Sequence, residues 1–262
     1  MKILLLGEYS NLHNSLKQAL INMGHEVLLV GNADGFKKYE TDILIKSHLE
    51  DYLLFKLIAR LFVRIFKINI FEIEIYLRAK KIVNKLQGFD VVQLINENSF
   101  KTSPLLEIKL LKQIFKNNNK VFLLSCGVDS VSVKHAMSKK LKYSILTPLF
   151  ENASLKKKYK PILKYERENY LALGKFVQEN VNGIISSDLD YHIPYFNKKK
   201  YLGMIPNPIN IQKIKYYGIN KSKKISILHA VNSSNKIKKG IFRFPKFLYI
   251  LQRFFQSHGF FQ

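Results

Sequence analysis

The chain has 262 residues, 47% of them hydrophobic, with 12 glycines and 7 prolines, which is typical of a globular protein and excludes a disordered one. Its single cysteine, Cys126, excludes an internal disulfide framework and suits a reducing compartment. The formal net charge of +24 favours anionic partners such as phospholipids and sugar phosphates.

The distribution of the basic residues along the chain bears on whether the anionic partner is a nucleic acid. Lysine, asparagine and isoleucine are abundant everywhere, as an AT-rich genome would give, and the basic residues follow the whole chain. Nucleic-acid binders usually gather them beside stacking aromatics in a recognisable module, so we expect no nucleic-acid partner. The apolar run Ile3–Leu6 is too short for a signal peptide, and no uncharged run reaches the roughly 18 residues of a membrane span. We expect a cytoplasmic protein.

The first predicted elements form a βαβ unit. Lys2–Leu6 is an apolar run that ends at Gly7, which predicts a buried strand followed by a tight turn. Residues 11–23 have apolar side chains on one helical face, and Glu26–Val30 predicts the next strand. Strand, helix and strand within about 30 residues predict a parallel sheet covered by helices.

The next notable segment, Tyr52–Lys67, combines a basic stripe with large apolar side chains. The stripe recurs at helical spacing and consists of Lys56, Arg60, Arg64 and Lys67. Such a helix can lie in a membrane interface, with its basic side chains on lipid phosphates. A helix packed on the core, with a solvated polar edge, is the alternative interpretation.

The strand–helix alternation continues to about residue 205. Further strands are predicted at Asp90–Ile95, Lys120–Ser125, Gly183–Ser186 and Leu202–Ile205. Helices are predicted at Leu105–Phe115 and Ile162–Glu179. Pro206 and Pro208 break regular structure, so we place a domain boundary there. Residues 1–209 are predicted to form a Rossmann-like α/β domain, and residues 210–262 a linker and the partial start of a second one, with a strand at Lys224–Val231.

Several short motifs, taken together and in order, resemble retaining glycosyltransferases of the GT-B, family-4-like type (glycosyltransferase group 1). The motifs cover residues 6–14, Gly24-His25-Glu26-Val27, residues 90–96, residues 206–210, Ile227-Leu228-His229-Ala230 and Lys238-Lys239-Gly240. The resemblance spans residues 1–240. It implies that the first domain is the acceptor-side domain of a GT-B fold and that a second domain binds a nucleotide sugar.

The resemblance implies a hexosyltransferase-like enzyme of cell-surface polysaccharide synthesis. It would transfer a sugar from a nucleotide-sugar donor to a lipid-linked or polysaccharide acceptor, working in the cytoplasm or peripherally on the inner face of the cell membrane. The family's Glu-rich donor motif has no counterpart here, so we expect the donor-binding domain to be truncated. Where the family carries His-Asp, this chain has Cys126-Gly127-Val128-Asp129, so only Asp129 carries over.

Candidate site residues follow the predicted strands at one edge of the sheet. Gly7, Glu8, Asn11, His13 and Asn96 are candidate acceptor contacts, because ligands of open α/β sheets bind at the carboxyl ends of the strands. Asn11 can instead be a helix N-cap, His13 a surface residue and Gly7 a turn glycine. Glu97 and Asp129 are the candidate catalytic carboxylates, either of which could take a proton from the acceptor; the alternative is a solvated loop. The histidines have no metal-ligand spacing, so we predict no metal site, and no cofactor is implied.

Three hypotheses remain open at this point. The chain is a glycosyltransferase with a nucleotide-sugar donor and a lipid-linked or oligosaccharide acceptor at an anionic membrane surface. Alternatively, it is a catalytically inactive remnant that only binds membrane or acceptor. The third hypothesis, a basic Rossmann-like nucleic-acid binder, predicts salt-sensitive retention on DNA but not on anionic vesicles.

Overall fold

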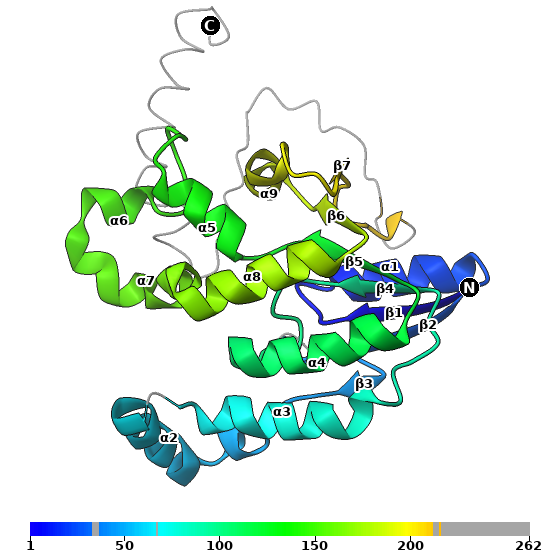
Figure 1. The fold of residues 1–262 in the computed structure, drawn as a ribbon, viewed down its shortest axis with the longest axis horizontal. Coiled ribbons are helices and arrows are strands. Elements are labelled where there is room, and N and C mark those ends of the chain that lie inside the picture. The colour runs from blue at the N-terminus through cyan, green and yellow to red at the C-terminus, as the bar shows by residue number, and fades with distance from the viewer. Residues whose placement is uncertain (33–36, 67, 212–214, 216–262) are drawn as a thin grey trace, which may run out of the picture. The chain divides into compact units, whose positions relative to one another are not determined.

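The described part of the chain is an α/β structure with seven parallel strands. The computed structural model describes residues 1–32, 37–66, 68–211 and 215. The strands are β1 (Lys2–Leu6), β2 (Glu26–Gly31), β3 (Ile43–Leu44), β4 (Val91–Leu94), β5 (Lys120–Ser125), β6 (Gly183–Ser186) and β7 (Tyr201–Met204). Their order across the sheet is β3-β2-β1-β4-β5-β6-β7, and every neighbouring pair is parallel (Figure 1).

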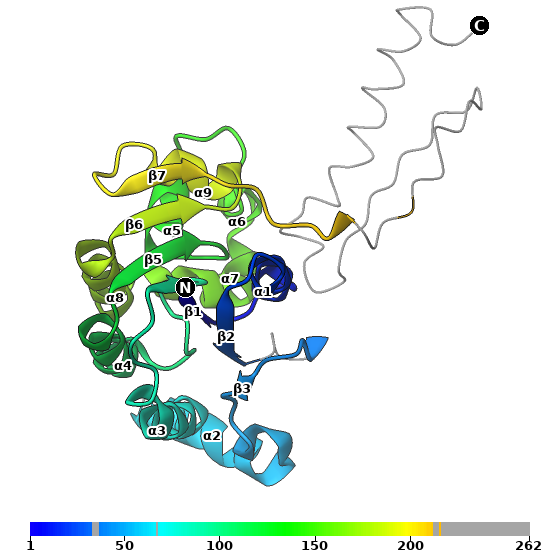
Figure 2. The same ribbon diagram turned by 90° about the vertical axis from the view of Figure 1, so that its right-hand side faces the viewer.

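Helices connect the strands and cover the sheet. The α-helices are α1 (Leu12–Asn22), α2 (Leu53–Phe66), α3 (Ile70–Val83), α4 (Pro104–Asn117), α5 (Ser130–Met137), α6 (Thr147–Glu151), α7 (Lys156–Leu163), α8 (Glu168–Asn180) and α9 (Leu189–Tyr195). Short 3-10 turns lie at η2 (Leu49–Asp51), η3 (Ala153–Leu155) and η4 (Lys164–Glu166). Helices α3, α4 and α8 line up on one face of the sheet, and α1 lies on the other (Figure 2).

The central strands are apolar because both of their faces are covered. Leu4, Leu5 and Leu6 of β1 are fully buried, with alternate residues facing the two helical layers. The larger core joins β1, β4 and β5 to α3, α4 and α8. The prediction of a Rossmann-like parallel sheet flanked by helices is therefore confirmed.

One predicted helix differs in the structure. The sequence predicts a single helix over Ile162–Glu179, but the chain leaves α7 at Leu163, forms η4 and enters α8 at Glu168. At Arg167 the backbone is extended, with φ −75° and ψ 147°, which interrupts the helical hydrogen bonding. The single predicted helix is therefore wrong at residues 164–167.

The chain divides into two compact units. The first comprises Met1–His135 and Ile162–Ile214, and it contains the whole sheet. The second comprises Ala136–Pro161 and Lys215–Gln262, and its described part includes α6. Residues 136–161 were predicted to belong to the first domain, and the sequence did not predict this division. The predicted second domain, residues 210–262 with the strand at 224–231, lies outside the described residues except at 210, 211 and 215.

Candidate functional site

The strand order places a topological switch point between β1 and β4. The chain goes from β1 to β2 and β3 on one side, and from β4 to β5, β6 and β7 on the other. Ligands of open α/β sheets bind outside the carboxyl ends of the strands at such a point. Leu6 and Leu94 pair at the ends of β1 and β4, so the loops that follow them are neighbours. These loops carry most of the predicted acceptor contacts.

Gly7 is required for the close approach of the two loops. Its φ is +90°, and a Cβ at this position would lie 2.1 Å from Cγ2 of Ile95. Both the left-handed backbone and the missing side chain therefore need glycine. The residue has the structural role of a turn glycine and also lies on the rim where a ligand would bind.

Glu8 and His13 support this loop from inside the protein. Both are fully buried. The Glu8 carboxylate accepts hydrogen bonds from the backbone N–H of Asn14, at 2.8 Å, and from its side-chain amide, at 2.9 Å. This carboxylate occupies the start of α1, where an anion is favoured by the helix dipole. Asn11 is the residue before α1, with a left-handed backbone and no side-chain capping bond.

His13 holds the carbonyl of Gly7, with 2.6 Å between Nδ1 and the oxygen. Because a carbonyl only accepts, Nδ1 of His13 carries a proton and donates this hydrogen bond. Burial lowers the pKa of His13 to about 4, and Nε2 has no hydrogen-bond partner among the described residues. Its burial makes it a support of the rim, and the predicted acceptor contact stays a prediction.

The lowered pKa of His13 gives a pH-dependent stability. A depressed folded-state pKa contributes stability that is present above the unfolded value of 6.5 and lost as the pH falls toward about 4. Between pH 7 and pH 5 we expect His13 to cost about 2 kcal/mol of stability. Urea unfolding at both pH values gives the free energy of unfolding of His13→Gln relative to the wild type. This difference should shift in favour of the variant by about 2 kcal/mol between pH 7 and pH 5. An equal difference at both pH values would contradict this assignment.

Asn96 connects the loops that follow β4 and β5. Its side-chain amide donates to the carbonyls of Cys126, at 2.9 Å, and Val128, at 3.3 Å, while its oxygen accepts from the N–H of Asn98. Asn96 is only 1% exposed. The geometry supports a positioning role for Asn96 at the sheet edge.

The two predicted catalytic carboxylates, Glu97 and Asp129, lie in one buried cluster. Glu97 accepts from the N–H and the hydroxyl of Ser130, at 2.9 and 2.8 Å. Burial, and secondarily the charge of Asp129, raises the pKa of Glu97 well above its usual range. Burial therefore disfavours the charged form of Glu97.

Asp129 is held by three donors. It accepts from the hydroxyls of Ser125, at 2.7 Å, and Tyr195, at 3.0 Å, and from the N–H of Ser132, at 2.7 Å. The last bond caps the start of α5. Glu97 and Asp129 are each 1% exposed. A catalytic role for either would require the loops to open; as they stand, the geometry supports a positioning role.

Sequence reasoning missed Lys101, the cation of this edge. Its backbone has φ +66°, and its ammonium lies 4.0 Å from the centre of the Tyr9 ring, a cation–π contact across the two loops. Lys101 is half-buried, and burial lowers its pKa to about 8. No carboxylate of the described chain lies within ion-pair distance of its ammonium. The position after a predicted strand was the available signal, but lysines are too frequent here for it to stand out.

Two further residues keep Lys101 and Tyr9 in place. Glu107, at the start of α4, accepts from the N–H groups of Phe100 and Thr102 and from the Thr102 hydroxyl, at 2.8–3.2 Å. These bonds fix the loop on both sides of Lys101; burial raises the pKa of Glu107 to about 7. Gly127 leaves room for the aromatic ring, because a Cβ there would lie 3.1 Å from Tyr9 Cε2.

The predicted membrane contacts lie on α2, away from the β1–β4 loops. Lys56, Arg60 and Arg64 are exposed, while Lys67 lies outside the described residues. Of all residues of α2, only Ala59 is buried. Within the described chain, α2 is therefore not buried in the core. No helix among the described residues is long and apolar enough to cross a membrane.

Comparison with protein-family models, with curated proteins and with solved structures found no match for this chain. Within the described residues, no three histidine, cysteine, aspartate or glutamate side chains gather as metal ligands would.

Proposed function

We propose that this chain is a GT-B-type, hexosyltransferase-like glycosyltransferase. It would transfer a sugar from a nucleotide sugar to a lipid-linked or polysaccharide acceptor in cell-surface polysaccharide synthesis. In this proposal the described sheet is the acceptor-side domain. The observation that carries it is the half-buried ammonium of Lys101 at the β1–β4 switch point, with no carboxylate of the described residues within ion-pair distance.

The charge of Lys101 selects the class of acceptor. A partly desolvated cation attracts an anion more strongly than an exposed one, and a lysine is a common phosphate ligand. Tyr9 beside it offers an aromatic face, on which an apolar or sugar surface packs well. A sugar carried on a lipid diphosphate supplies both chemistries, since its phosphates lie between the sugar and the lipid.

The position of α2 agrees with such an acceptor. A lipid-linked sugar stays in the bilayer, so the enzyme must work at the membrane surface. Helix α2 exposes large apolar side chains, including Leu53 at 74%, Leu57 at 50% and Ile65 at 60%, together with its basic residues. An amphipathic helix of this kind binds in the interface of an anionic membrane without crossing it.

A second candidate function is binding without transfer. It is favoured by the burial of Glu97 and Asp129, which leaves the described edge with ligand-binding groups but without an open carboxylate. Catalysis would then depend on residues elsewhere or be absent. Both candidates share the acceptor site at Lys101.

The shared site is tested by the binding of farnesyl diphosphate to the full chain, measured by isothermal titration calorimetry. We expect Lys101→Met to weaken binding by about tenfold or more, because one charge-assisted hydrogen bond contributes on the order of 1.5–3 kcal/mol. Lys85→Met, an exposed substitution between α3 and β4, is the matched control and should leave the affinity unchanged.

Two results would count against the proposal. Equal affinities of wild type and Lys101→Met would remove the acceptor site from the β1–β4 edge. Binding of farnesol as tightly as farnesyl diphosphate would show that the lipid tail, and not the phosphate, is recognised. A separate assay distinguishes transfer from binding alone. The full chain is incubated with radiolabelled nucleotide sugars and a bacterial lipid extract, and label that appears in the lipid fraction shows transfer.

A further inference from the structure

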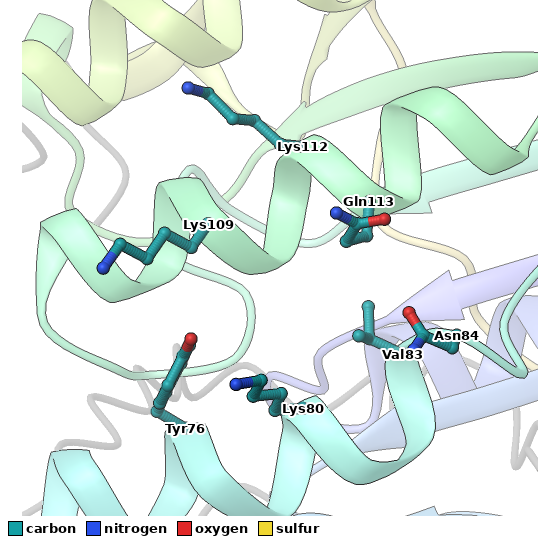
Figure 3. A pocket seen from close by; sticks show the side chains of 7 residues that line it. All are labelled: Tyr76, Lys80, Val83, Asn84, Lys109, Lys112 and Gln113. Carbon is teal, nitrogen blue, oxygen red and sulfur yellow. The ribbon is translucent and has the colours of Figure 1, made fainter.

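A surface groove separates α3 from α4, on the helical layer that contains both. Its volume is about 470 Å³, and the buried Val83 is among its lining residues. Three lysines and three neutral polar side chains line the rest: Lys80, Lys109, Lys112, Tyr76, Asn84 and Gln113. Figure 3 shows the Tyr76 hydroxyl directed from α3 toward α4, whereas the Lys112 amine points away from α3. Lysines from two helices therefore border the groove, whose inner lining is mainly apolar.

The charge of the groove is not balanced by its own residues. No carboxylate is among the residues that line it. None of its three lysines forms an ion pair with a described residue. Three exposed lysines along one groove make this stretch of the surface positive and attract an anion. The ligand class is therefore anionic, and ammonium, hydroxyl and amide donors together suit a phosphate.

Exposed apolar side chains continue from this groove toward α2. On α3, Ile73 and Leu77 are 37% and 51% exposed, and on α4, Leu105 is 64% exposed. These apolar residues precede the lysines along each helix. Both helices start at the carboxyl edge of the parallel sheet, and α2 packs near the start of α3 (Figure 1). The same side of the protein thus changes from apolar at α2 to basic in the groove.

We propose that the α3–α4 groove binds the phosphate of an anionic phospholipid headgroup while α2, with Ile73, Leu77 and Leu105, enters the membrane interface. This apolar-to-basic order matches a bilayer surface, in which acyl chains lie beneath a layer of phosphates. A nucleic acid would satisfy the lysines but not the apolar residues beside them. The inference deepens the membrane contact in the proposed function, and it fixes which face meets the lipid.

The proposal is tested by flotation of the full chain with vesicles. One set is phosphatidylcholine alone and the other is phosphatidylcholine with phosphatidylglycerol. The groove variant carries Lys80→Gln, Lys109→Gln and Lys112→Gln. A lysine near an anionic surface strengthens binding about fivefold, so we expect the groove variant to bind the anionic vesicles on the order of 100-fold more weakly.

A control of equal charge distinguishes a site from diffuse attraction. Lys120 is the first residue of β5, and Lys198 and Lys199 precede β7; all three are exposed and lie at the opposite, amino-terminal edge of the sheet. Their triple glutamine variant should lose less than tenfold, because these side chains would be far from the headgroups and screened by salt. Equal losses in the two triple variants would overturn the proposal.

Further measurements separate the other outcomes. Circular dichroism should show that both triple variants are folded, since all six lysines are exposed. Loss of binding to single-stranded DNA, with vesicle binding unchanged, would assign the groove to nucleic acid and overturn the proposal. The groove variant should still bind farnesyl diphosphate, and Lys101→Met should still bind vesicles, so this inference and the proposed acceptor site fail separately.

Discussion

Replacing Gly174 with alanine is expected to destabilise the first unit by roughly 2–3 kcal/mol. At an ordinary helical position this change stabilises by about 1 kcal/mol, because alanine has the higher helix propensity. At Gly174 in α8, however, a Cβ would lie 2.0 Å from the Ser130 hydroxyl and 2.6 Å from a Glu97 carboxyl oxygen. The added methyl group must displace the hydrogen bonds that hold Glu97. Urea unfolding followed by circular dichroism measures the effect, since the chain has no tryptophan.

A double-mutant cycle identifies the clash as the cause. Ser130→Gly removes the hydroxyl that the new methyl group meets first, so Gly174→Ala should cost less in that background. Gly24→Ala provides the backbone control. Gly24 has φ +83° with no neighbour within 4 Å, so its alanine variant should cost about 1–2 kcal/mol from strain alone. A stabilising Gly174→Ala, or strict additivity with Ser130→Gly, would contradict the packing described for Glu97.

Replacing Asp129 with alanine is expected to cost about 3–4 kcal/mol. The change leaves the Ser125 hydroxyl, the Tyr195 hydroxyl and the N–H of Ser132 without their acceptor in a buried site. It also removes the cap of α5. Loss of the charge beside Glu97 offsets a part of this cost, because that charge raises the pKa of Glu97.

Asp129→Asn is the matched variant. Its amide oxygen can still accept from Ser132, and its NH2 group can donate to either hydroxyl after these rotate. We therefore expect a loss of only about 1 kcal/mol in the same unfolding experiment. A cost for alanine as small as that for asparagine would show that the three hydrogen bonds do not hold this edge.

Every described strand except β3 could be predicted, because each of the others is a short run with a clear end, whereas β3 has only two residues, Ile43 and Leu44. Gly7 after β1 and Cys126-Gly127 after β5 are such ends. Parallel strands bring their carboxyl ends to one edge, so the grouping of Gly7, Asn96 and Asp129 followed from the fold class. The fold class does not predict whether these side chains face a ligand or the protein interior.

Burial at this edge depends on segments far away in the sequence. Glu97 is covered by Gly174 of α8, and Asp129 meets Tyr195 of α9, 66 residues further along the chain. No local pattern around either carboxylate records these contacts. The same holds for Lys101, whose contact with Tyr9 joins two loops that are distant in sequence but follow adjacent strands. Helix α2 was predictable, because its stripe of basic residues is local.

The most direct test of the acceptor site is the footprint of farnesyl diphosphate on the full chain, measured by amide hydrogen exchange. We predict slower exchange in the loops after β1, β4 and β5, at residues 7–11, 95–103 and 126–129, with little change in α3 and α4. Protection confined to the α3–α4 groove, or no protection in these three loops at saturating ligand, would contradict an acceptor site at the β1–β4 edge.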